Sequence, residues 1–190
     1  MTTNDTSSGN TNNWNIDVAH SGINFSVRHM VVSKVRGHFG KFSGTLAIDD
    51  ADLARSSVDV TIDASSIDTG VAQRDGHLRS PDFLDVERYP EIRFLSTRLH
   101  RLGADQYHLA GELTIRGVTR QVLLDVELGG RAKDPWGNER IGFSAKTSID
   151  RKDYGLAWNQ VLEAGGVLVG DRVDIELEVE AVRAAAAQAA

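Results

Sequence analysis

Apolar and polar residues alternate with a period of two along most of this chain. In the clearest run, near the C-terminus, valine, isoleucine and leucine residues are separated by Asp174, Glu176 and Glu178. Alternation of this kind places one face of a β-strand in a dry environment and the other in water. Similar segments follow one another at 23–27, 35–39, 42–48, 58–62, 92–96, 107–115, 122–128 and 143–149.

Turn signals separate these segments. They include Asp49-Asp50, Gly129-Gly130 and the stretch Asp134–Asn138, which contains a proline and a glycine. Many strands joined by short turns form a meander, and a long meander has to close or stack because open edges invite aggregation. The chain is long enough for a barrel of about eight strands.

Helices have little room in this pattern. One short helix is predicted over Val71–Leu78, and Pro81 stops it. A single helical turn is also expected around Arg28–Val32. The pattern therefore predicts an all-β fold, a barrel or a sandwich, with one or two short helical caps.

One domain accounts for the chain, with a tail at each end. Residues 1–13 are rich in Thr, Asn, Ser and Gly and predict a disordered tail, and residues 184–190 form an alanine-rich tail. The barrel is expected over residues 14–183. The N-terminus lacks the regions of a secretory signal, and no stretch approaches the ~18–20 apolar residues of a membrane span. We therefore expect a cytoplasmic protein without stable membrane insertion.

Charge and cysteine content exclude several function classes. A net charge of -6 with an isoelectric point near 5.5 argues against nucleic-acid binding, which needs a clustered basic surface. The absence of cysteine excludes disulfides, thiolate nucleophiles and zinc–thiolate sites. The six histidines show no metal-ligand spacing, so no metal and no cofactor are expected. The pattern leaves both a monomer and a homodimer open.

Catalytic motifs are also missing. Ser21 lies near His20, His29 and Asp17, but alternation places neighbouring strand residues on opposite faces, and no Gly-x-Ser-x-Gly elbow is present. Asp17 and Ser21 are expected to shape a turn, and no catalytic residue is assigned.

Three groups of longer motifs go beyond simple alternation. The first contains Phe25-Ser-Val-Arg-His29 and Ser33-Lys-Val-Arg-Gly37, and the second contains Arg74-Asp-Gly-His-Leu-Arg-Ser80 and Asp82-Phe-Leu-Asp85. The third contains Gly111–Thr119, Ile149–Gly155 and Val169–Val173. Together they resemble the YceI family of lipocalin-like polyisoprenoid-binding proteins, over nearly all of residues 14–182. The resemblance implies an eight-stranded antiparallel barrel, lipocalin-like and with the short helical caps, that holds a polyprenyl chain or a related amphiphile as a carrier. It brings no catalytic residues.

The ligand-binding residues are expected on the apolar strand faces and at the barrel mouth. Small residues facing the axis, Gly37, Gly44, Gly111 and Ala145, would leave space there. Arg74 or His77 could meet a polar head at the mouth, whereas the favoured interpretation is that Arg74 and Asp75 pair locally and tie the cap to a strand end. The predicted ligand-binding set is Phe25, Val27, His29, Phe42, Phe94, Leu113, Phe143, Arg74 and His77.

Two other functions stay open at this point. A hydrolase or isomerase acting on an apolar substrate would need a buried titratable pair, drawn from His29 or His77 with Asp75 or Asp85. A filled barrel serving as a structural or stress protein would show no cavity and an exposed apolar patch.

Overall fold

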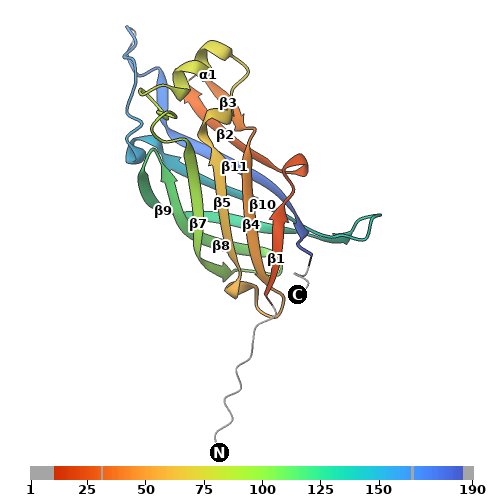
Figure 1. The fold of residues 1–190 in the computed structure, drawn as a ribbon. Coiled ribbons are helices and arrows are strands. Elements are labelled where there is room, and N and C mark those ends of the chain that lie inside the picture. Colours follow the sequence, from red (N-terminus) through yellow and green to blue (C-terminus); the bar gives the residue numbers. More distant parts are fainter. Residues whose placement is uncertain (1–10, 31, 164, 186–190) are drawn as a thin grey trace, which may run out of the picture.

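The strands close into an antiparallel β-barrel, shown in Figure 1. The computed structural model describes residues 11–30, 32–163 and 165–185. The strands in this part of the chain are β1 (Thr11–Ile16), β2 (Gly22–His29), β3 (Ser33–Phe39), β4 (Phe42–Asp49), β5 (Ser57–Asp63), β6 (Ile67–Asp68), β7 (Glu91–Arg101), β8 (Gln106–Ile115), β9 (Val118–Lys133), β10 (Glu139–Asp150) and β11 (Val169–Arg183).

Bends divide some of the barrel strands into two segments. β11 pairs with β2 along its first part and with β1 near its end, so β1 and β2 form one bent strand. In the same way, β3 pairs with β2 and β4 pairs with β1. On the next strand along, β6 pairs with β3 and β5 pairs with β4. The ring of β1, β4, β5, β7, β8, β9, β10 and β11 closes where β1 pairs with both β4 and β11. The predicted eight-stranded antiparallel barrel is confirmed.

The helical caps are short. Helix α1 (Ala72–Arg79) lies over one end of the barrel in Figure 1 and matches the predicted helix to within a residue at each end. Single 3-10 turns are η1 (Val18–His20), η2 (Leu53–Arg55), η3 (Ala64–Ser66) and η4 (Arg151–Tyr154). No helix among the described residues is both long and apolar enough to cross a lipid bilayer.

The first two residues of the helical turn expected around Arg28–Val32 are in a strand. Arg28 and His29 end β2, where they pair with Lys34 and Ser33 of β3. Met30 then adopts a positive φ of 51°, which turns the chain back into β3 instead of starting a helix. The pairing of β2 with β3 therefore overrides the local preference.

The last three residues of the predicted N-terminal tail, residues 11–13, belong to a strand. β1 begins at Thr11, because Thr11–Asn13 pair with Ala47–Asp49 of β4 and complete the ring. At the other end β11 runs to Arg183, and the Ala184 amide donates to the Asn13 carbonyl at 2.8 Å. Residues 1–10 and 186–190 of the two predicted tails lie outside the described residues.

Gly129-Gly130 does not form a turn. Both glycines lie within β9, where the pairing with β10 shifts between Gly142 and Phe143. The turn follows at Asp134–Asn138, as predicted, and is closed by a 2.9 Å hydrogen bond from the Asp134 amide to the Asn138 carbonyl. The shift keeps the strands paired up to this turn, since a bulge absorbs one extra residue without ending a strand.

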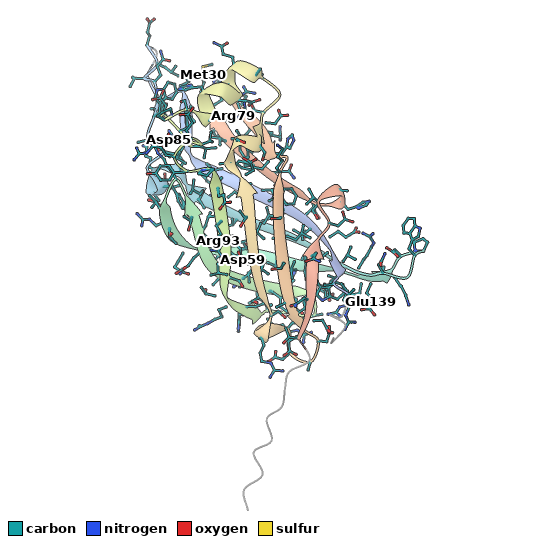
Figure 2. The ribbon with its side chains drawn as sticks, viewed as in Figure 1. Met30, Asp59, Arg79, Asp85, Arg93 and Glu139 are labelled. Carbon is teal, nitrogen blue, oxygen red and sulfur yellow. The ribbon has the colours of Figure 1, made fainter. Side chains whose placement is uncertain are left out.

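The barrel wall separates a dry interior from a charged outer face. The inward side chains form a large apolar cluster, and a smaller cluster around Trp14 fills the interior beside the closure at β1. On the outer face Arg93 Nη2 lies 2.7 Å from Asp59 Oδ2 across β5 and β7, and Figure 2 shows both side chains on this wall. The predicted alternation thus sets which face of each strand is buried.

Candidate ligand-binding cavity

The barrel interior contains two adjoining cavities, of about 220 Å³ and about 120 Å³. The larger lies at the α1 end, where Leu78 and Phe83 are part of its wall. The smaller lies towards η2, where Leu53 is part of its wall. The interior is therefore hollow along much of its length. The two cavities have four wall residues in common, Val60, Phe94, Leu124 and Leu177.

The walls are almost entirely aliphatic and aromatic. The polar residues of the larger cavity are Asn24, which is exposed to solvent, together with Thr147 and Arg151. Thr147 Oγ1 donates a 2.8 Å hydrogen bond to the Leu123 carbonyl. The hydroxyl of Thr147 is thus already engaged by the protein, and an enclosed ligand would meet chiefly hydrocarbon.

Arg151 is a buried cation beside the larger cavity, with a side chain 4% exposed. Its Nε donates to the Gly170 carbonyl at 2.9 Å, and Nη1 donates to the Leu156 and Trp158 carbonyls. Nη2 donates to the Val169 carbonyl and to Asp171 Oδ1. Burial lowers the pKa of Arg151. All five guanidinium N–H groups have acceptors, so Arg151 holds η4 against the start of β11 and has no free donor for a ligand.

Inward-facing glycines on the barrel wall are covered by neighbouring side chains. A Cβ at Gly111 would lie 2.4 Å from Phe94 Cζ, and a Cβ at Gly37 would lie 2.5 Å from Phe25 Cζ. At Gly44 the covering atom is Ile16 Cδ1, at 2.7 Å. These glycines do not leave empty space directly, as the sequence suggested. They let larger side chains approach the backbone of the wall closely.

The predicted apolar residues divide between the two cavities. Phe25, Val27, Phe94 and Leu113 lie on the wall of the larger one, whereas Phe143 lies on the wall of the smaller one. Phe42 packs against the core but borders neither cavity. Their contact with a ligand stays a prediction. Strand alternation alone could have added further wall residues that were not singled out, such as Ile23, Ile62, Ile92 and Ile175.

Arg74 and Asp75 tie the cap to a strand end. Asp75 Oδ1 accepts hydrogen bonds from the Thr69 amide at 2.9 Å and from Thr69 Oγ1 at 2.5 Å. Arg74 Nε donates to Thr69 Oγ1 at 2.7 Å, and its Nη2 donates to the Thr69 carbonyl. Both side chains therefore bind Thr69, directly after β6. These contacts attach α1 to a strand end, as the favoured interpretation expected, but they do so through Thr69 and not through an ion pair between Arg74 and Asp75.

His77 lies behind the wall of the larger cavity, against Phe83. Its ring packs edge-on against Phe83 and Trp158, with centroids 5.1 Å and 4.6 Å away, and Nε2 lies 2.9 Å from Asp82 Oδ2. Phe83 and Trp158 are themselves 5.4 Å apart. These three rings join the α1 segment to the loop after η4. His29, the other histidine of the predicted set, borders neither cavity.

The arrangement offers little to a catalytic mechanism. Neither cavity wall includes His29, His77, Asp75 or Asp85, the four candidates for a titratable pair. Ser21 Oγ is bound to the backbone of Glu180 in β11. It donates to the Glu180 carbonyl and accepts from the Glu180 amide. Nothing in these contacts assembles an acid and a base around the cavity.

One group of ionisable side chains outside the barrel interior has the spacing of metal ligands. The ligand atoms of Asp17, His20 and Glu180 lie within 4.8 Å of one another, the one such group found among the described residues. Arg140 Nη1 donates to both Asp17 and Glu180. A guanidinium thus already neutralises these carboxylates, and a cation would have to displace it.

Comparison with known proteins gives a consistent result. Residues 14–181 match the family model of the YceI-like domain. A UPF0312 protein of Vibrio cholerae is 40% identical over 165 residues, which cover 87% of this chain and 83% of the relative. The crystal structure of BcnA from Burkholderia cenocepacia superposes with a TM-score of 0.77 at 25% identity, over 87% of this chain and 98% of that one.

A third protein is similar in fold alone. A polyisoprenoid binding domain from Saccharophagus degradans, implicated in plant cell wall breakdown, has a TM-score of 0.66 at 18% identity. The match covers 90% of this chain and 98% of that domain. The barrel, the match over residues 14–181 and the Vibrio cholerae relative together show that this chain belongs to the YceI-like family.

Proposed function

We propose that this protein binds a polyisoprenoid, or a similar long apolar amphiphile, inside its barrel and acts as a carrier for it. The observation that carries the proposal is the pair of adjoining cavities with walls of aliphatic and aromatic side chains. The resemblance of the motifs to polyisoprenoid-binding proteins supports the ligand class. So does the similar fold of the Saccharophagus degradans domain, which is described as polyisoprenoid-binding.

The chemistry of the walls decides which part of the ligand is enclosed. Hydrocarbon that leaves water gains about 25 cal/mol for each Å² of buried surface. A charged head inside the barrel would find no cationic donor at Arg151, because the protein already uses the whole guanidinium. The apolar chain is therefore the enclosed part, and the polar head stays at the α1 end or outside.

The same energetics favour exchange over permanent storage. A lipid bilayer is as apolar as the barrel interior, so transfer of a prenyl chain between them has a free energy near zero. A protein of this kind takes up ligand from one membrane and releases it to another instead of holding it irreversibly. This balance is what a carrier requires.

The proposal is tested by identifying the bound lipid and by blocking the cavity. Native mass spectrometry and organic extraction of the protein from its own source should yield a prenyl lipid or a similar amphiphile. Geranylgeraniol should bind the purified chain. Leu124→Phe adds volume to a residue that borders both cavities, and it should weaken geranylgeraniol binding by about tenfold, or about 1.4 kcal/mol.

The neighbouring residue provides the matched control. Leu123 is 50% exposed on the outer face, so Leu123→Phe should leave geranylgeraniol binding unchanged. Circular dichroism would show that both variants are folded. The proposal fails if extraction yields no lipid and no prenyl alcohol binds, or if the two variants affect binding equally.

A further inference from the structure

Phe94 occupies the position where the two cavities meet. It is the largest of the four residues that border both cavities, and the one aromatic residue among them. Its side chain is 9% exposed and extends inward from β7. The ring therefore lies at the boundary of the two cavities, where any passage between them has to run.

The ring of Phe94 lies against the wall because residue 111 is a glycine. A Cβ at Gly111 would be 2.4 Å from Phe94 Cζ, 2.5 Å from Phe94 Cε2 and 2.7 Å from the Leu95 carbonyl oxygen. Real Cβ atoms do not approach other atoms this closely, so any other residue at position 111 would displace the ring and press on the backbone of β7. The adjoining free space is in the two cavities that Phe94 borders, so a displaced ring would move into the passage.

The volumes show why the passage matters. Protein pockets for small molecules usually begin at ~300 Å³. The larger cavity, at about 220 Å³, and the smaller one, at about 120 Å³, each fall short of this size, and together they exceed it. A ligand that uses both volumes has to pass beside Phe94 as a thin linear chain.

We propose that Phe94 and Gly111 form a gate between the two cavities, and that this gate sets the length of linear chain that the barrel accepts. The inference rests on the proposed function for its ligand class. Gly111 keeps the gate open by giving the Phe94 ring a place on β8. A chain long enough to pass the gate gains the apolar contacts of the smaller cavity, and a short chain does not.

The test uses linear prenyl alcohols of increasing length: farnesol, geranylgeraniol and solanesol. Binding to the unmodified protein should strengthen from farnesol to geranylgeraniol as the second cavity is filled. In Gly111→Ala this gain should disappear, so that affinity for geranylgeraniol falls by about tenfold, or about 1.4 kcal/mol, while affinity for farnesol changes little. An unchanged dependence on chain length in Gly111→Ala would overturn the gate.

Two further variants separate the gate from general damage to the barrel. Gly111→Ala/Phe94→Ala removes the displaced ring and should restore the dependence on chain length. Gly37→Ala is the matched control, because its Cβ also meets a phenylalanine ring and a backbone carbonyl, those of Phe25 and Asp68, and Phe25 borders the larger cavity alone. It should weaken binding of all three alcohols to a similar degree. If the double variant behaves like Gly111→Ala, the ring of Phe94 is not the obstacle and the gate is wrong.

A second readout does not depend on prenyl binding. Xenon enters apolar cavities, so crystals under xenon pressure should show xenon in both cavities of the unmodified protein. In Gly111→Ala the Phe94 ring should lie across the passage, and xenon in the smaller cavity should be reduced. A ring that stays on β8 in this variant would overturn the inference. Failure of every prenyl alcohol to bind, together with the expected xenon result, would count against the proposed function and leave the gate in place.

Discussion

Arg140 Nη1 lies 2.7 Å from Asp17 Oδ2, although 123 positions separate the two residues in the sequence. Asp17 lies at the bend between β1 and β2, where its other oxygen accepts a hydrogen bond from the Ala19 amide. Arg140 also binds Asp134 and Glu180, so one guanidinium joins this bend to the β9–β10 turn and to β11. The contact lies where β11 changes its partner from β2 to β1.

This contact predicts a component of stability that is lost in acid. Hydrogen bonds from Arg140 and, to a lesser extent, from His20 lower the pKa of Asp17 from 3.8 to about 2. A carboxyl group with a lowered pKa in the folded state stabilises the fold above its unfolded pKa, and that contribution is lost as the pH falls through the folded pKa. Asp17→Asn should therefore unfold at a lower temperature than the unmodified protein at pH 7, and the difference should shrink between pH 4 and pH 2.

Asparagine at position 17 keeps an oxygen that can accept from the Ala19 amide, so the variant chiefly removes the charge. Asp125→Asn is the control, because Asp125 is 79% exposed and forms an ion pair with a partly exposed histidine, His108. The control should follow the unmodified protein at every pH in thermal unfolding. If Asp17→Asn does the same, Arg140 does not stabilise the bend through this carboxylate.

The alternation of apolar residues was enough to predict the barrel, because each strand buries one face whatever its neighbours are. The bends were not predictable in this way. Asp17 stabilises its bend through Arg140, and nothing in the local sequence connects the two. In the same way, the start of β1 at Thr11 depends on pairing with β4, which a polar segment such as Thr11–Asn13 does not indicate by itself.

The cavity was predictable in part for a similar reason. Alternation places Phe94 and Gly111 on inward faces, but their contact depends on how β7 and β8 are aligned. That alignment shifts between Ser96 and Arg98, and the shift has no clear signal in the sequence. Arg151 was missed because a charged residue directly after an apolar strand is usually exposed, whereas here the backbone carbonyls of a loop satisfy it.

Asp75 is expected to keep the α1 cap on the barrel. It is 6% exposed and accepts two hydrogen bonds from Thr69, so Asp75→Ala leaves a partly buried amide and a hydroxyl without this acceptor. We expect a loss of about 1–3 kcal/mol in stability. Hydrogen exchange in residues 69–80 and release of bound geranylgeraniol should both become faster. Asp82→Ala, which removes an exposed partner of His77, should change neither rate by as much.

Arg151 is expected to be essential for folding stability. Arg151→Met removes five hydrogen-bond donors and leaves four backbone carbonyls of the 156–170 segment without this partner. Loss of a buried, fully paired charge costs at least about 3 kcal/mol, which urea unfolding would measure. Lys152→Met removes an adjacent cation that is 51% exposed and pairs with Asp171, and it should cost less than about 0.5 kcal/mol. Equal effects of the two substitutions would contradict this role of Arg151.

The hydroxyl group of Tyr154 is expected to lower the free energy of unfolding. It is 1% exposed, and its hydroxyl has no hydrogen-bond partner among the described residues. Because a buried hydroxyl without a partner is unfavourable, Tyr154→Phe should raise the free energy of unfolding by about 1 kcal/mol. Tyr107→Phe is the matched control, since the Tyr107 hydroxyl donates to the Ala104 carbonyl at 3.5 Å, and it should not stabilise the protein.

The pH dependence of unfolding gives a second test of the same side chain. Burial raises the pKa of Tyr154 from 10.0 to about 12. Between these values the unfolded chain ionises at this tyrosine and the folded chain does not, so the folded state loses stability as the pH rises from 10 towards 12. Tyr154→Phe should lack this part of the alkaline loss, and Tyr107→Phe should retain it, in urea unfolding measured across that range. A destabilised Tyr154→Phe would mean that the hydroxyl has a bonding partner in solution.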